Sequence, residues 1–322
     1  MILKERKVPL RILQSEALLR RLSPEHPLIP IIQEDLRKRR AGFRGEQDVD
    51  RHLELLADED FTIFHDVRLL FGNHYFQMDT LILTSYFAVI LEVKNIFGTL
   101  EFDLGLKQLI RKANGKGEGF LDPITQVKKQ EYIFRKWLLE NKINQLPIKS
   151  FVVISNPTTI LKVQNNEELR KYVTHLHNLY QILLEYKQHH QSLKLEVKDL
   201  RRLSKKIIKS NTPVTSNSLE YYNLKKEDIQ TGVICPECGT SPMMRKCGVW
   251  ICSYCRATSK SAHVQALSDF FILLKPTITN QEAKTFLHLS SRDQTYTILK
   301  KSNFSSTDST KNREYFLPTI LQ

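Results

Sequence analysis

Four apolar segments between residues 61 and 155 have the composition and spacing of β-strands. Three of them, FTIFHDV (61–67), FQMDTLIL (76–83) and FAVILEV (87–93), are rich in aromatic and β-branched residues. The fourth, SFVVIS (150–155), has an apolar centre, as expected of a buried strand. We therefore predict three consecutive strands and a fourth strand farther along the chain.

Two segments flanking these strands have helical periodicity, residues 46–57 and residues 124–140. The second segment is amphipathic and is preceded by Asp122 and Pro123, a favourable N-cap and first-turn pair. The predicted order is helix, three strands, helix, strand. The polar stretch SNTPVTSNS (210–218) is the best candidate for a linker.

The chain carries a large excess of basic residues. It has 322 residues, with 48 Lys plus Arg against 35 Asp plus Glu, and its formal net charge is +13. Such a surplus indicates an anionic partner, with nucleic acid as the first candidate and an acidic membrane surface as the second. The alternative is a basic protein that uses its charge for neither purpose.

The first residues, MILKERKVPLRILQ, are charged and lack the apolar segment of a signal peptide. No run approaches the roughly 20 apolar residues that cross a bilayer. We therefore expect a cytoplasmic protein without a membrane partner.

All five cysteines lie between Cys235 and Cys255. Cys235-x-x-Cys238 and Cys252-x-x-Cys255 have the paired spacing that suits one tetrahedral Zn²⁺. The pattern resembles a zinc ribbon, and four protein ligands would close the site and make the ion structural. A redox C-x-x-C motif is the alternative, which the second matched pair disfavours. We expect the remaining Cys247 to be a small buried residue rather than an alternative ligand.

The third predicted strand ends in charged residues. Successive side chains of a strand point to opposite faces, so Glu92 and Lys94 share one face. If the preceding hairpin has a two-residue turn, Thr84 pairs with Phe87, and the same register places Asp79 opposite Glu92.

Two neighbouring carboxylates repel each other, which raises the pKa of one of them unless a cation lies between them. Mg²⁺ suits a site of one or two carboxylates completed by phosphate and water. It polarises a phosphoryl oxygen and lowers the pKa of a bound water, and a nearby lysine can orient that water or stabilise charge on the phosphate. These residues therefore indicate a metal-dependent phosphodiesterase. The alternative for so short a pattern is a surface salt bridge on an edge strand.

The D…E-x-K arrangement within a helix–strand–strand–strand–helix–strand order resembles the PD-(D/E)xK nuclease superfamily. More closely, residues 40–155 resemble the NERD (nuclease-related) domain through four ordered motifs. These are Gly42, Gly45 and Glu46 at a helix start; Gln77 and Asp79; Glu92, Lys94 and Asn95; and Pro123 with Gln126.

The resemblance implies a role for each residue of the site. Asp79 and Glu92 would bind Mg²⁺ or Mn²⁺, and Lys94 would activate water or stabilise the transition state. Glu46 would add a carboxylate, and Gln126 would orient water or phosphate. The alternatives are a first-turn helix acid for Glu46 and a solvent-facing amide for Gln126.

The C-terminal segment contains three short helical patterns and a strand-like EYFLP (314–318). Thr279-x-x-Glu282 is a capping box, and Ser290 or Ser291 would cap the third helix. This order resembles a winged helix, with a packing or protein-interaction module as the alternative. The resemblance would place the following residues toward DNA: Arg292, Gln294, Thr295, Lys300, Lys301, Lys311 and Arg313.

The predicted fold class is α/β, with a restriction-endonuclease-like α-β-β-β-α-β core, a mixed sheet, a small zinc ribbon and a small helical C-terminal domain. The predicted parts are a basic helical extension at 1–40, a nuclease core at 41–155, its extension at 156–209, a linker at 210–230, the ribbon at 231–260 and the winged-helix-like segment at 261–322. The predicted function is metal-dependent hydrolysis of DNA. The alternatives are a catalytically silent nucleic-acid-binding protein of the same fold and an RNA-directed nuclease.

Overall fold

The computed structural model describes residues 1–56, 60–162, 167–302, 304–307 and 313–316. The chain divides into two compact units, one formed by residues 1–7 and 40–214 and the other by residues 8–39 and 215–322. Within the described ranges, no helix combines the length and apolar character needed to cross a bilayer.

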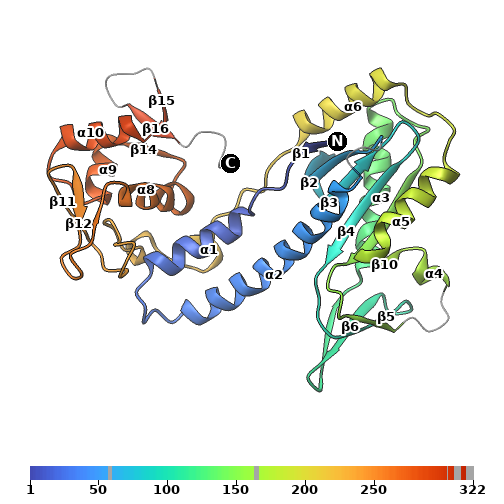
Figure 1. Ribbon diagram of the computed structural model, residues 1–322, viewed down its shortest axis with the longest axis horizontal. Coiled ribbons are helices and arrows are strands. Elements are labelled where there is room, and N and C mark those ends of the chain that lie inside the picture. The colour runs from blue at the N-terminus through green and yellow to red at the C-terminus, as the bar shows by residue number, and fades with distance from the viewer. Residues whose placement is uncertain (57–59, 163–166, 303, 308–312, 317–322) are drawn as a thin grey trace. The chain divides into compact units, whose positions relative to one another are not determined.

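The first unit is built on a mixed six-stranded sheet in the order β1-β2-β3-β4-β8-β10 (Figure 1). Strands β2, β3 and β4 are antiparallel neighbours, whereas β1 pairs in parallel with β2, and β4, β8 and β10 are parallel to one another. The strands are β1 (Ile2–Lys4), β2 (Thr62–Phe71), β3 (His74–Leu83), β4 (Ala88–Lys94), β8 (Ile148–Ile154) and β10 (Val173–His175).

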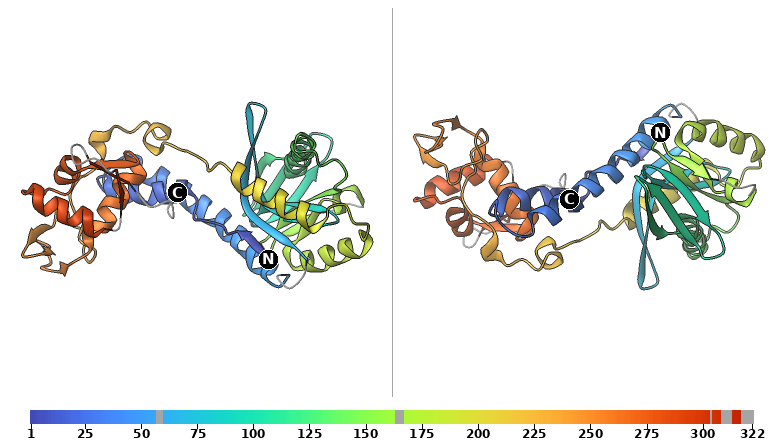
Figure 2. Two further views of the ribbon diagram at one scale, coloured as in Figure 1. Left: turned by 90° about the horizontal axis from the view of Figure 1, so that it is seen from above. Right: turned by 90° about the horizontal axis from the view of Figure 1, so that it is seen from below.

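Helices cover both faces of this sheet (Figure 2). The C-terminal part of α2 (Ile29–Glu54) and α5 (Leu176–His189) pack on one face, and α3 (Pro123–Glu140) and α6 (Val197–Ser210) pack on the other. The predicted α/β core with a mixed sheet is therefore confirmed, as is the N-cap of α3, where the Asp122 carboxylate accepts hydrogen bonds from the backbone N–H groups of Ile124 and Thr125.

The first unit contains a second sheet in the order β7-β6-β5-β9, which was not predicted. Strands β5, β6 and β7 lie between β4 and α3 in the sequence, and β9 follows β8. The strands of this second sheet are β5 (Thr99–Asp103), β6 (Gln108–Ala113), β7 (Lys116–Leu121) and β9 (Ile160–Lys162), and a short helix α4 (Glu167–Arg170) follows. Strand β6 has two adjacent apolar residues, Leu109 and Ile110, among polar ones, and β7 is mostly exposed, so neither has the apolar alternation by which a strand is recognised from sequence.

The second unit contains two adjoining apolar clusters, one around the cysteines and one around α1 (Leu10–Arg21). Its other elements are α7 (Ser218–Tyr221), the 3₁₀ helix η1 (Lys226–Asp228), β11 (Met244–Lys246), β12 (Val249–Ile251), β13 (Thr258–Ser259), α8 (Ala262–Leu273), β14 (Thr277–Thr279), α9 (Asn280–Phe286), α10 (Arg292–Lys301), β15 (Ser305–Ser306) and β16 (Glu314–Phe316). Asp269 of α8 is fully buried and forms ion pairs with Arg20 and Arg21 of α1.

Candidate active site

Strands β3 and β4 form a hairpin that opens into a fork at the candidate site. Their ladder runs from Leu83↔Ala88 to Thr80↔Leu91, which is the predicted register. Beyond it, β3 continues its pairing with β2 alone, and Glu92 to Lys94 pair with β8. We call this opening the β3–β4 fork.

Asp79 is the first residue of β3 beyond the β3–β4 ladder, and its side chain bridges the two strands where they separate. Its Oδ2 accepts a hydrogen bond of 2.9 Å from the backbone N–H of Val93, one residue after Glu92. Burial raises the pKa of the Asp79 carboxyl well above its ordinary value, and the charges of Glu92 and Glu46 raise it further. Asp79 and Glu92 are therefore close enough to interact electrostatically, as the hairpin register predicted.

Glu92 is buried, with only 3% of its surface exposed, and three side chains satisfy its carboxylate. Oε1 accepts from Lys94 Nζ at 2.6 Å and from Gln126 Nε2 at 2.7 Å, and Oε2 accepts from Gln130 Nε2 at 2.8 Å. Lys94 Nζ also donates to Gln126 Oε1 at 3.2 Å. Gln126 is exposed, but its amide is hydrogen-bonded to Glu92 and Lys94. The alternative that its amide faces only solvent is therefore wrong.

Gln130 was missed by the sequence analysis. It lies one helical turn after Gln126 on α3, so both amides reach the same carboxylate. The sequence did contain a signal for Gln130. It lies four residues after Gln126, and positions i and i+4 of a helix share one face.

Glu46 comes from the middle of α2 rather than from a helix start. The expectation that the G-x-x-G-E motif begins a helix is wrong, because α2 already begins at Ile29. Glu46 is therefore no first-turn acid. Burial raises the pKa of its carboxyl, Arg6 opposes that rise, and the charges of Asp66, Asp50 and Glu92 add to it.

Arg6 is the second residue that the sequence analysis missed. Its guanidinium, 4% exposed, donates to Glu46 Oε2 at 2.7 Å, to Asp50 Oδ2 at 2.7 Å and to the backbone carbonyl of Asp79 at 2.8 Å. A fourth contact reaches Thr80 Oγ1 at 3.2 Å. Arg6 therefore links α2 to β3 at the base of the β3–β4 fork. No local pattern in the sequence around Arg6 indicates this role.

Gly45 lets α2 approach the ends of β4 and β8. A Cβ atom at this position would lie 2.5 Å from Asn95 Cβ and would also collide with Ser155 Oγ. Gly42, the other glycine of the motif, has no atom within 4 Å of such a Cβ. Only Gly45 is thus required by close packing, and it directly precedes Glu46.

The carboxylates have the donor chemistry that a hard divalent cation prefers. Asp79, Glu92 and Glu46, which we call the carboxylate site, are oxygen donors. The pKa values of Asp79 and Glu46 are raised because their charged forms are partly desolvated and lie close to other negative charges. Mg²⁺ needs only one or two carboxylates, since water and phosphate oxygens complete its coordination. The three carboxylates are more loosely spaced than a preformed three-ligand cluster, and Lys94 neutralises part of their charge.

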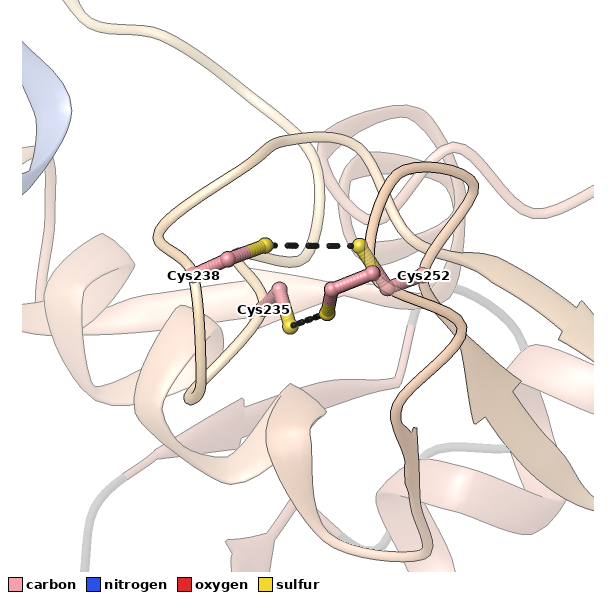
Figure 3. Close-up of side chains that lie close together, drawn as sticks. Cys235, Cys238 and Cys252 are labelled. Atoms are coloured by element: carbon pink, nitrogen blue, oxygen red, sulfur yellow. Dashed lines mark hydrogen bonds between the residues drawn. The ribbon is translucent and has the colours of Figure 1, made fainter.

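The four paired cysteines form a compact cluster (Figure 3). The Sγ atoms of Cys235 and Cys255 are 3.7 Å apart, and those of Cys238 and Cys252 are 3.6 Å apart. Four sulfurs around one zinc, at Zn–S distances of about 2.3 Å, would be about 3.8 Å apart. The cluster therefore has the size of a tetrahedral zinc site and fits a zinc ribbon.

Cys247 is neither buried nor part of this cluster, so the expectation of a buried residue is wrong. It forms the two-residue turn between β11 and β12 together with Gly248. Both residues have positive φ, 46° and 81°, as a type I′ hairpin turn requires. The turn exposes the Cys247 side chain.

The C-terminal elements follow one another in the order α8, β14, α9, α10, β15, β16, and the three strands form an antiparallel sheet in the order β14-β16-β15. The capping box at Thr279 and Glu282 is present, and the side chain of Ser291 caps α10. Both features were predicted.

The residues expected to face DNA differ in exposure. Arg292, Lys300 and Lys301 are exposed, whereas Gln294 and Arg313 are half-buried. The expectation for Thr295 is wrong, because its side chain is fully buried and its hydroxyl donates to the Ser291 carbonyl. It shares a helix face with the buried residues of α10. Lys311 lies outside the described residues.

Comparison with known proteins bears on the first unit. Residues 41–155 match the family model of NERD, the nuclease-related domain. No curated protein and no solved structure matches the chain significantly. The matched segment contains the β3–β4 fork, the carboxylate site, Lys94 and both glutamines. The chain therefore carries a nuclease-related domain at residues 41–155.

Proposed function

We propose that the first unit is a metal-dependent nuclease that hydrolyses phosphodiester bonds in DNA. The observation that carries this proposal is the electrostatic interaction of three carboxylates from three elements near the β3–β4 fork, within the nuclease-related domain. Asp79 and Glu92 would hold Mg²⁺ or Mn²⁺, and Glu46 would supply a further carboxylate. When bound, the ion supplies Lewis acidity toward the phosphate and lowers the pKa of a coordinated water.

The remaining residues position the reacting groups. The Lys94 ammonium, already held by Glu92 and Gln126, would orient the attacking water or stabilise negative charge developing on the phosphate. The amides of Gln126 and Gln130 each donate to a different oxygen of Glu92 and so fix the orientation of its carboxylate. Gln126 is exposed and can also reach water or phosphate.

The second unit would hold the substrate. Zn²⁺ bound by Cys235, Cys238, Cys252 and Cys255 would stabilise a ribbon, and the α8–β16 segment would act as a winged helix. The order of its elements and the exposed cations Arg292, Lys300 and Lys301 on α10 support this role. Contacts of these cations with phosphates would make the affinity sensitive to salt.

The test is cleavage of plasmid, linear duplex, single-stranded DNA and RNA by the full chain with Mg²⁺ or Mn²⁺. We expect the wild type to cleave DNA and Asp79→Asn and Glu92→Gln to lose about 100-fold or more of the rate. Glu131→Gln is the matched control, because Glu131 lies on α3 beside Gln130 and accepts a hydrogen bond from Ser150 instead. Equal inactivity of wild type and variants on every substrate would refute the enzyme, and cleavage of RNA alone would refute DNA as its substrate.

A further inference from the structure

A polar cavity of about 490 Å³ lies in the first unit, and none of the three carboxylates is among its lining residues. It is formed by one side of α2 and by the segments that follow the parallel strands β4 and β8. Its lining includes Arg44, Gln47, Arg51, Asn95, Ser155 and Asn156. The carboxyl ends of parallel strands are the usual place for a ligand in an α/β sheet, and the volume is that of an ordinary ligand site.

The lining offers hydrogen-bond donors without partners. Over the described residues, the side chains of Arg44 and Gln47 make no hydrogen bond or ion pair. The hydroxyl of Ser155 is also without a partner there, although only 5% of the residue is exposed. Asn156 Oδ1 accepts two hydrogen bonds from Thr158, which leaves its amide N–H groups for a ligand. An unpartnered buried hydroxyl is costly unless a ligand or water satisfies it.

The charges of the cavity favour an anion. Arg44 and Arg51 contribute two guanidinium groups, and Asp48 is the one acid of the lining. Asp48 forms an ion pair with Arg51 of the same helix, so the lining retains a net positive charge. Guanidinium and amide donors together are the groups that bind phosphate oxygens.

Residues of the cavity neighbour residues of the carboxylate site in the sequence. Gln47 follows Glu46, and Asn95 follows Lys94. The backbone N–H of Ser155 donates to the Lys94 carbonyl at 3.1 Å. Successive strand residues point to opposite faces, and Glu46 lies on the other flank of α2 from Arg44 and Arg51, so the cavity is a separate site that is close to the carboxylate site only along the chain.

We infer that this cavity, which we call the arginine cavity, binds a backbone phosphate of the nucleic-acid substrate other than the phosphate that is cut. The inference rests on the proposed nuclease function, because it names a second place at which the enzyme would hold its substrate. Arg51 and Arg44 bind the phosphate, and the amides and the Ser155 hydroxyl complete its hydrogen bonds. Such contacts fix the position of the strand and carry no sequence information.

The experiment measures binding of a labelled 20-nucleotide DNA, single-stranded and duplex, by fluorescence anisotropy over a series of salt concentrations. Every protein is the full chain with Asp79→Asn, so that cleavage does not interfere. We expect Arg51→Gln to weaken binding about tenfold. The salt slope should fall by about 0.7 for the single strand or 0.9 for the duplex, as expected for one lost phosphate contact. Asp48→Asn should tighten binding, because it removes the acid that competes for Arg51.

Arg202→Gln is the matched control. Arg202 on α6 also pairs with an aspartate three residues earlier, and its side chain is 74% exposed compared with 64% for Arg51. It lies on a basic helix outside the cavity, so its removal should change the Kd by less than about twofold. Equal weakening by Arg51→Gln and Arg202→Gln, weaker binding by Asp48→Asn, or no binding at low salt would each overturn the inference.

The outcome is separable from that of the cleavage test. If the wild type cleaves DNA while Arg51→Gln behaves like Arg202→Gln, the nuclease stands and the arginine cavity fails. If Arg51→Gln and Asp48→Asn shift binding in opposite directions while the wild type is inert, the cavity binds nucleic acid and the nuclease proposal fails.

Discussion

Arg6 Nη1 lies 2.7 Å from Glu46 Oε2, and this ion pair joins the N-terminal residues to the carboxylate site. The same guanidinium also binds Asp50 and the carbonyl of Asp79. It is nearly inaccessible to solvent and therefore weakly screened. Arg6 thus holds two acidic side chains of α2 against the base of the β3–β4 fork.

Replacing Arg6 by Met should destabilise the first unit and impair cleavage. Removing one partner of a buried ion pair leaves uncompensated charge, here on Glu46 and Asp50, and costs about 3 kcal/mol of unfolding free energy. Urea unfolding followed by the fluorescence of Trp137 measures this change. Arg135→Met should cost less than about 1 kcal/mol, because Arg135 is 48% exposed in its pair with Glu131. A loss no larger than that of Arg135→Met would contradict the role of Arg6.

Alanine at Gly45 and at Gly42 should have opposite effects. Gly45→Ala places a Cβ against Asn95 and Ser155, so we expect a loss of about 1–3 kcal/mol in unfolding free energy and reduced cleavage through displacement of Glu46. Gly42→Ala meets open space within a helix and should gain up to about 1 kcal/mol. Thermal unfolding and cleavage rates of the two variants give the comparison. Similar changes in both would show that close packing at Gly45 is unimportant.

Much of the carboxylate site could be predicted from sequence because its information is local. The two-residue turn after Thr84 sets the register of the hairpin, and the strand period of two then brings Asp79 and Glu92 to one face. Gln126 follows from the helix start that Asp122 and Pro123 specify.

The rest depends on contacts between distant positions. Arg6 reaches Glu46 across 40 residues, and β1, which precedes it, is too short for a periodic pattern. Neither β6 nor β7 has the apolar alternation of a recognisable strand. Thr295 and Cys247 were misplaced because helix rotation and turn geometry, rather than residue type, decide their exposure.

Serine at Cys252 and at Cys247 should separate the proposed zinc ligands from the spare cysteine. Wild type should bind about one zinc per chain, and Cys252→Ser should lose most of it. Its near-ultraviolet circular dichroism should also fall, because metal binding supplies folding free energy to a small ribbon. Cys247→Ser should retain both zinc and spectrum, since Cys247 lies in an exposed turn. Metal-free wild type with an unchanged spectrum would exclude a structural zinc.

His263 should make the stability of the second unit depend on pH. Burial, followed by the charge of Arg245, lowers the pKa of its imidazole to about 4, and its Nδ1 accepts a hydrogen bond from the Trp250 indole. The folded state therefore favours neutral histidine. The contribution of neutral His263 to the free energy of unfolding is present in full above about pH 6.5. It is lost as the pH falls toward 4, and the whole loss amounts to about 3 kcal/mol.

His263→Asn is the control for this dependence. An asparagine Oδ1 can accept the indole hydrogen bond but does not titrate, so the variant should lose less stability than the wild type between pH 6.5 and 4. Denaturant unfolding at several pH values, with metal content held equal, measures the difference. Parallel curves for the two proteins would show that His263 does not titrate on unfolding.

Two of the four helices that cover the main sheet, α5 and α6, lie beyond the segment that matches the nuclease-related domain. Leu179 and Leu183 of α5 cover one face, and Leu203 and Ile207 of α6 cover the other, all four being nearly inaccessible. A fragment trimmed to residues 41–155 would leave this apolar surface bare and would also lack Arg6, which favours aggregation over folding. The first unit is therefore discontinuous in sequence, and a fragment of residues 1–214 would in turn expose the apolar residues of α1 that pack within the second unit.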